Sequence, residues 1–379
     1  MTNRERLMAT LNGKSVDRPA VNFYEIGGIK VTPSDPSEFN IYNHPSWQPL
    51  LQLAEQETDL IRTRNPWLTG KQNDARHQFM KVEQFVQNGN QFIRTIINIG
   101  GRTLMSLTRR DPEVDTVWTI EHLLKDIEDL KAYIRLPDDL FEYEPDISEL
   151  IQADLEVGDR GIVMVDTSDP LCMGASLFSM EDYTVIALTE QSLFHALLEK
   201  LSRSLYLTTE KVAKRFPGHL WRIFGPEYAS EPYLPPYLFK EYVVRYVEPM
   251  VQTIQKYGGF ARIHCHGRIQ NILPYIIQMG ACGIDPIEPP PQGDMELSKA
   301  RLEYGKDLVL FGNLEINDIE YMKTNDFKKV VLKSLTDGTR GEGRGFVLMP
   351  SASPYGRIIT GQTMANYSAI VELTKSFVV

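Results

Sequence analysis

The feature that most constrains the fold is an alternation of short apolar runs and amphipathic segments, which begins at residue 161 and continues to the end of the chain. Apolar runs of about five residues predict strands, and the segments between them have the apolar spacing of helices. Strands that alternate with helices form parallel βαβ units. The predicted strands are 161–166, 220–224, 260–264, 283–288, 308–312 and 345–349, and the predicted helices are 191–216, 237–257, 269–278, 295–304, 326–336 and 362–377.

Two further strands are predicted near the N-terminus, at 20–25 and 59–64, after a short helix over 3–11. They raise the number of strands to eight, which is the number in a (β/α)8 barrel. An open, doubly wound sheet is the competing architecture. However, no predicted strand is followed by a glycine-rich phosphate-binding motif that would support a nucleotide fold. We therefore expect an α/β protein that forms one TIM barrel domain over residues 1–379.

Residues from about 70 to 160 do not follow the βα alternation and predict an elaboration of the barrel. Residues 79–101 alternate apolar and polar side chains around Asn88-Gly89, which is a strong β-hairpin signal. The whole block 79–119 is therefore predicted to be an antiparallel β insertion. A helix over 120–133 is predicted to follow it.

Composition excludes several functions. The chain has 50 acidic and 40 basic residues and a net charge of −10, which argues against binding to nucleic acid. No apolar run approaches the ~20 residues of a transmembrane helix, and the N-terminal segment lacks the apolar core of a signal peptide. The three cysteines, Cys172, Cys265 and Cys282, build no disulfide framework. These features predict a cytoplasmic protein that acts on a small molecule, without a membrane partner.

Polar residues stand at the end of nearly every predicted strand. The carboxyl ends of the strands form the active site of a (β/α)8 barrel, so these residues are candidates for function. Asp166 is expected to orient a substrate or act as a base, with a turn or helix-cap role as the alternative. Glu288 precedes three prolines that would hold a catalytic carboxylate in place. The candidates for substrate binding are Glu25, Asn65, Asn313, Ser351, Ser353 and Tyr355, and Glu315 falls at the same end.

The sharpest motif is His264-Cys265-His266-Gly267. Residues i and i+2 of a strand share a face, so His264 and His266 converge while Cys265 points away. Two imidazoles and a carboxylate form a catalytic zinc set with one open position. Glu227 follows the preceding strand and Glu288 the following one, so either could reach the two histidines. The predicted ligands of zinc or another divalent metal are Glu227, His264 and His266. The alternative is that one histidine only packs or hydrogen-bonds against a neighbouring strand end.

Several stretches together resemble the uroporphyrinogen decarboxylase superfamily, which includes the decarboxylase itself and cobamide-dependent methyltransferases. The resemblance implies a (β/α)8 barrel, in agreement with the strand count. It also implies a homodimer, whose interface the 79–119 insertion would alter. The similar stretches are NRERLMATLNGKSVDRPAV, IHCHG, IIQMGACGIDPIEPPPQGDMELSKARLEYGKDLVLFGNLE and GFVLMPSASP.

The chain departs from both branches of that superfamily. Decarboxylases carry an Arg-x-Ala-Gly-Arg-Tyr segment for substrate carboxylates, and the corresponding FYEIGGIKVTPSD has no arginine. A substrate with eight carboxylates would also be repelled by a mouth rich in Glu and Asp. Methyltransferases hold zinc with His-x-Cys-Gly and a later Cys. Here His266 occupies the first Cys position and Ala352 the second, so a metal would have harder ligands and act on oxygen.

Three functions follow as expectations. The first is a metal-dependent methyltransferase that moves a methyl group between a small O- or N-methyl substrate and a corrinoid carried by a partner protein. The second is a cofactor-independent decarboxylase of a small carboxylated substrate. It needs a basic group near the pocket, and the candidates are Arg62, Arg262, Arg268 and Arg357. The third is a non-catalytic relative that binds a ligand.

Overall fold

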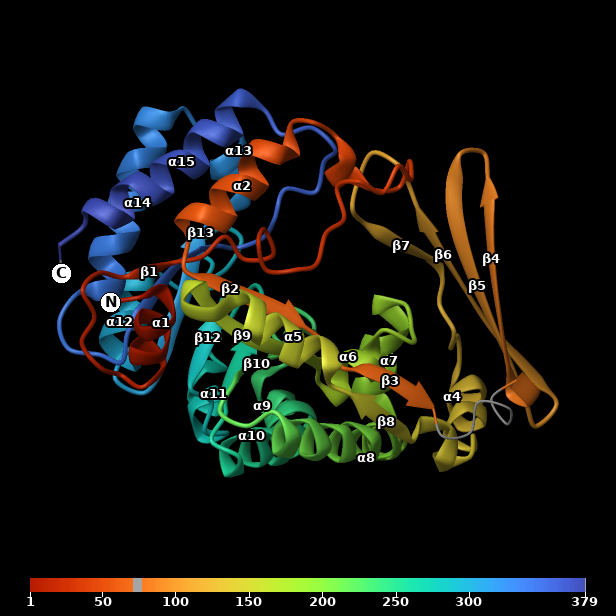
Figure 1. Cartoon of the computed structure of the whole chain (residues 1–379). Coiled ribbons are helices and arrows are strands. Elements are labelled where there is room, and N and C mark those ends of the chain that lie inside the picture. Colours follow the sequence, from red (N-terminus) through yellow and green to blue (C-terminus); the bar gives the residue numbers. More distant parts are fainter. Residues whose placement is uncertain (71–76, 379) are drawn as a thin grey trace.

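The computed structural model describes residues 1–70 and 77–378. Eight parallel strands form one curled sheet in the order β1-β14-β13-β12-β11-β10-β9-β2, and helices lie between the strands (Figure 1). The predicted TIM barrel fold is thereby confirmed. The strands are β1 (Ala20–Val21), β2 (Leu60–Arg64), β9 (Gly161–Ser168), β10 (Leu220–Phe224), β11 (Phe260–His264), β12 (Gly283–Asp285), β13 (Val309–Leu314) and β14 (Phe346–Pro350).

The helices cover the outer face of the sheet, so most barrel strands are buried on both faces. No helix in the described part of the chain is both long and apolar enough to cross a membrane. The helices of the barrel are α1 (Asn3–Leu11), α2 (Trp47–Glu57), α5 (Ser148–Val157), α6 (Pro170–Ala175), α7 (Met180–Thr189), α8 (Gln191–Arg215), α9 (Pro236–Phe239), α10 (Arg245–Lys256), α11 (Leu273–Gln278), α12 (Leu297–Tyr304), α13 (Ile316–Tyr321), α14 (Thr324–Thr339) and α15 (Gly361–Ser376).

The interior of the barrel has an apolar floor and a polar upper part. Alternate residues of each strand face inward, and the lower ones form a separate apolar cluster that includes Ile162, Val309 and Phe311. Leu7 and Leu11 of α1 belong to the same cluster, so the first helix packs against this floor. The polar residues that follow at the carboxyl ends therefore stand on a packed base.

The predicted elaboration lies between the second and third barrel strands. Short strands β3 (Trp67–Gly70) and β8 (Tyr143–Asp146) pair with each other. A separate four-stranded antiparallel sheet contains β4 (Met80–Gln87), β5 (Asn90–Ile99), β6 (Arg102–Arg110) and β7 (Val117–Glu121). This sheet projects from the barrel on the side away from both termini (Figure 1). Asn88 and Gly89 have φ values of 52° and 75°, as a tight hairpin turn requires, so the predicted hairpin is confirmed.

The predicted helix over 120–133 was placed too early. β7 continues to Glu121, and helix α4 (Ile127–Ile134) begins only after Asp126, whose carboxylate accepts from the backbone N–H of Asp129. The β-branched and aromatic residues just before 121 favour a strand, and the aspartate supplies the helix cap. The predicted strand over 20–25 is likewise shorter, because the chain turns at Tyr24.

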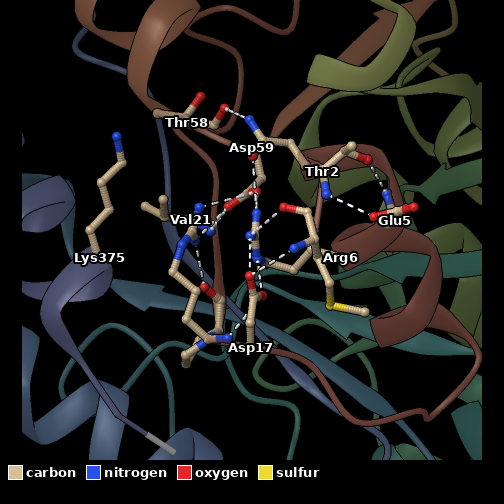
Figure 2. A network of polar contacts seen from close by, with 12 residues as sticks. Thr2, Glu5, Arg6, Asp17, Val21, Thr58, Asp59 and Lys375 are labelled. Atoms are coloured by element: carbon tan, nitrogen blue, oxygen red, sulfur yellow. Dashed lines mark hydrogen bonds and ion pairs between the residues drawn. The ribbon is translucent and has the colours of Figure 1, made fainter.

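One buried carboxylate joins the first and second strands of the barrel, which stand at opposite ends of the strand order (Figure 2). Asp59 accepts from the backbone N–H of Val21 at 2.8 Å, and its own N–H donates to the Val21 carbonyl at 2.7 Å. Its carboxylate also binds Arg6 at 2.6 Å and Arg18 at 2.9 Å. The side chain of Asp59 is completely buried, so these contacts replace its water and close the barrel.

Candidate functional site

A row of charged side chains crosses the interior just above the apolar floor. The strand register sets Asp166 of β9, Arg222 of β10 and Arg262 of β11 side by side. Arg222 donates to both oxygens of Asp166, at 2.6 and 2.9 Å. Burial lowers the pKa of Arg222, but the bonds to Asp166 outweigh burial and the pKa is raised overall. Asp166, predicted to be catalytic, is thus bound to an arginine.

Tyr24 connects this row to the histidine motif. Arg222 donates to the Tyr24 hydroxyl at 2.7 Å, and that hydroxyl lies 3.5 Å from Nε2 of His264. Nδ1 of His264 is 2.7 Å from Asp285, which also forms an ion pair with Arg262 at 2.8 Å. Burial lowers the pKa of His264 despite the neighbouring carboxylate. We infer a neutral ring that donates from Nδ1 to Asp285 and accepts from Tyr24.

His266 stands above this network and has a carboxylate of its own. Its Nδ1 is 2.9 Å from Glu288, and the other oxygen of Glu288 accepts from the backbone N–H of Gly267 at 2.7 Å. Burial lowers the pKa of His266, but Glu288 outweighs burial and raises it overall. Glu288 in turn has a lowered pKa, because His266 and Gly267 outweigh its burial. The site therefore contains one neutral histidine and one that favours the charged form.

We expect Glu288→Gln to lower the pKa of His266. The amide removes the negative charge that stabilises the imidazolium, while burial continues to oppose the charge. Titration of the His266 ring by NMR measures this change, and the ring of the exposed His77 serves as the control. An unchanged His266 titration would show that Glu288 does not charge the ring.

The end of β13 contributes polar groups that have few partners. Asn313 and Glu315 are 9% and 7% exposed, and Glu315 lies close enough to Glu288 and His266 for both to shift its pKa. Within residues 1–70 and 77–378, Oδ1 of Asn313 and Oε1 of Glu315 are buried without a hydrogen bond. The Ser351 hydroxyl donates to Oε2 of Glu315 at 3.4 Å. Burial and the nearby Glu288 raise the pKa of Glu315 to about 7.

Two more carboxylates complete the mouth. Burial raises the pKa of Glu25, and the positive charge of Arg222 opposes that rise. Glu227 lies on the short turn after β10, close enough to raise the pKa of His266 and of the fully buried Asp169. The turn begins at Gly225, where φ is 115° and a Cβ would lie 2.1 Å from that of Cys172. A glycine is required there to bring the Glu227 segment against α6.

The structure does not bring every predicted residue together. Asn65 is exposed and lines a cavity of about 310 Å³ between the barrel wall and α8, together with Leu68 and Trp221. Tyr355 is 53% exposed on the loop after β14, beside Tyr321. The groups that do share the mouth are Glu25, Glu227, His264, His266, Glu288, Asn313, Ser351 and Ser353.

The two histidines and their carboxylates have only part of the arrangement of a metal site. Each histidine binds a carboxylate through Nδ1, as metal-binding histidines commonly do. However, no three His, Cys, Asp or Glu side chains in the described residues are placed to hold one ion. Nε2 of His264 instead faces the hydroxyl of Tyr24. This geometry does not fit a three-ligand site, and the set of Glu227, His264 and His266 stays a prediction.

The cysteines lie as the strand pattern predicts. Cys265 is fully buried on the outer face of the barrel, opposite the two histidines, and Cys282 is buried in the apolar floor. All three cysteines are free. Burial raises the pKa of each thiol, so none is activated as a nucleophile.

Tyr24, Arg222 and Asp285 belong to the site but were not among the predicted functional residues. Arg222 is the single charged residue of the run Leu-Trp-Arg-Ile-Phe, and Arg262 has the same position in Phe-Ala-Arg-Ile-His. A lone arginine inside a buried strand requires a buried partner. That signal was available, but it does not say which acid is the partner.

One solved structure supports this fold. A methyltransferase from Methanosarcina mazei has a similar solved structure, with a TM-score of 0.59 and 14% identity over 100% of this chain and 99% of that one. D-psicose 3-epimerase covers 63% of this chain and 77% of its own, with a TM-score of 0.30 and 11% identity. IOLI protein with a bound zinc covers 60% and 94%, with a TM-score of 0.31 and 11% identity. No curated protein matches the sequence.

The fold and the strand-end residues define a (β/α)8 barrel protein with a polar site at the carboxyl ends of its strands. The family model of uroporphyrinogen decarboxylase (URO-D) matches residues 112–377, which include β9 to β14 and the histidine motif. The chain belongs to the uroporphyrinogen decarboxylase family.

Proposed function

We propose that this chain is a methyltransferase, which moves a methyl group between a small O- or N-methyl substrate and a corrinoid carried by a partner protein. Within its family the competing reaction is decarboxylation. The observation that supports methyl transfer is the charge pairing of the barrel interior, where each inward-facing cation of the described residues already has a carboxylate partner. The pairs are Arg222 with Asp166, Arg262 with Asp285 and His266 with Glu288, and the neutral His264 is bound to Asp285 as well.

A decarboxylase must hold a substrate carboxylate, and a cation is the natural partner for it. Of the four candidate arginines only Arg262 faces the interior, where Asp285 neutralises it. Arg62 binds Glu55 outside the barrel, Arg357 binds Asn43 and loop carbonyls, and Arg268 is exposed after β11. Glu25 and Glu227 add carboxyl groups that would repel an anion. A neutral or cationic methyl donor suits this mouth better.

The residues have distinct roles in the proposed reaction. The network of Asp166, Arg222, Tyr24, His264 and Asp285 fixes the floor of the site and the orientation of His264. Its buried charges are mutually paired, so it positions groups and does not itself react. His266 and Asn313 face the substrate from two different strands. The corrinoid supplies the methyl-accepting cobalt, and no metal is assigned a step.

The experiment is an assay of methyl transfer from 2-methoxyphenol or trimethylamine to reduced cobalamin, followed in the visible spectrum. In parallel, release of CO2 from 2-hydroxybenzoate is measured. We expect methyl transfer by the wild type and a loss of roughly 100-fold in His266→Ala, because a hydrogen-bonding imidazole is removed from the site. The exposed Glu149→Gln, whose partner is Lys30, is the matched control.

Other outcomes separate the remaining functions. Release of CO2 without methyl transfer would establish the decarboxylase, and neither reaction would favour a non-catalytic relative. Treatment with a chelator, followed by addition of zinc, tests the predicted metal. If zinc alone restores the lost activity, the site binds a metal after a rearrangement of the side chains described here.

A further inference from the structure

The carboxyl group of Glu315 has a placement that a merely structural residue would not need. It follows β13 at the carboxyl end of the barrel and is 7% exposed. Although it precedes α13, its side chain makes no cap hydrogen bond to that helix. Oε2 receives one long bond from Ser351, and in the described structure Oε1 has no partner. One buried oxygen is thus available to a ligand.

The surroundings of Glu315 keep a proton on this carboxyl group. Glu288 faces it from the end of β12, Asp318 lies on α13, and Ser351 approaches from β14. His266, which follows β11, lowers the pKa of Glu315, but Glu288 already binds that ring. Burial and these carboxylates together hold the pKa of Glu315 near neutrality, at about 7. Near neutral pH, a substantial fraction therefore carries an O–H that is free to donate.

We infer that the methyl donor is an O-methyl compound and that Glu315 donates the proton that its leaving oxygen takes up. The inference rests on the proposed methyl transfer and adds the substrate class and the general acid. Asn313, two residues earlier in the chain, also has a buried carbonyl oxygen that lacks a hydrogen-bond partner among the described residues. That oxygen accepts a hydrogen bond from a neighbouring hydroxyl of the donor.

In the inferred methyl transfer, the electron pair of reduced cobalt forms the bond to the methyl carbon, and the bond from that carbon to oxygen breaks. Its electron pair stays on the oxygen, which takes the proton from Glu315 and leaves as an alcohol or phenol. Glu315 becomes a carboxylate and regains its proton from water. The reduced corrinoid is the only co-reactant.

An N-methyl donor would not use this acid. An ammonium donor leaves as a neutral amine and needs no proton, so a protonated carboxyl beside it would contribute nothing to the reaction. The acid is useful only where the leaving atom would otherwise carry a negative charge, as oxygen does.

The test compares leaving groups in wild type and Glu315→Gln, with reduced cobalamin as methyl acceptor. 2-Methoxyphenol has a basic leaving oxygen, whereas 4-nitroanisole leaves as a stable anion. We expect Glu315→Gln to lose about 10²–10⁴-fold with 2-methoxyphenol and little with 4-nitroanisole, because general acid catalysis matters most for basic leaving groups. In wild type, the 2-methoxyphenol rate should fall as pH rises through about 7, and Glu315→Gln should lack that fall.

Equal losses with both ethers, or a rate that rises with pH, would overturn the role of Glu315. Transfer from trimethylamine but from neither ether would overturn the substrate class and leave the proposed methyl transfer standing. Failure of all donors with cobalamin would instead count against the proposed function. If Glu315→Gln does not fold by circular dichroism, the pH profile and the ratio of the two ethers in wild type give the same decision.

Discussion

Asp59→Ala is expected to lower the free energy of unfolding by about 3–5 kcal/mol, because it leaves buried charges without a partner. Arg6 is 4% exposed and would lose the acid it meets at 2.6 Å, and Arg18 would lose the same partner. The backbone N–H of Val21 would also lose its acceptor. Because these contacts join the first two barrel strands, we expect the lower stability to affect the whole barrel in one cooperative unfolding transition. Urea unfolding followed by circular dichroism measures it.

Asp17→Ala is the matched control for this prediction. Asp17 binds the same Arg6 at 2.7 Å, but its side chain is 42% exposed. Water replaces such a partner at little cost, so we expect a loss of about 1 kcal/mol or less. Similar losses in the two variants would show that barrel closure does not depend on the buried carboxylate.

Asp285→Asn is expected to destabilise the chain by a similar amount and to disturb the site as well. The amide keeps the size of the side chain but removes the charge that balances Arg262, and both side chains are almost fully buried. It also no longer fixes the ring of His264. We therefore expect about 3–5 kcal/mol lower stability and slower methyl transfer. Asp326→Asn, which breaks an exposed pair with Lys329, should change neither measurement.

The same residue predicts a dependence on pH. Burial alone would raise the pKa of Asp285, but Arg262 and His264 outweigh burial and lower it from 3.8 to about 2. A lowered pKa in the folded state stabilises the protein fully above the unfolded value of 3.8, and the effect is lost as pH falls towards 2. Wild type should lose more stability than Asp285→Asn between pH 4 and 2. An equal dependence of the free energy of unfolding on pH in the two proteins would contradict this ion pair.

Much of the fold was predictable because it depends on local pattern. The strands at 220–224 and 260–264 and the helix at 3–11 have the predicted bounds, since each is an apolar run or a capped segment with clear ends. The segment at 120–133 failed because a strand and a helix share it. The closure at Asp59 depends on residues 38 to 53 positions earlier in the sequence, and no local pattern reveals those contacts.

The location of the site could be predicted from the sequence, but the pairing and protonation of its side chains could not. The alternation of side chains along a strand predicted His264 and His266 on one face and Cys265 on the other, and the structure agrees. Which acid binds which histidine depends on the register between strands, and so does the pairing of Arg222 with Asp166. Glu315 stood at a strand end in the sequence, but its protonation follows from burial and from Glu288, which only the fold brings near.

The most direct test of the central claim is to follow the methyl carbon itself. 2-Methoxyphenol labelled with ¹³C in its methyl group is incubated with the protein and reduced cobalamin, and the products are resolved by NMR. Methyl transfer predicts that the ¹³C signal moves from oxygen to cobalt while the unmethylated phenol accumulates in equal amount. A label that stays on oxygen, while a carboxylated substrate releases CO2 from the same preparation, would contradict the account.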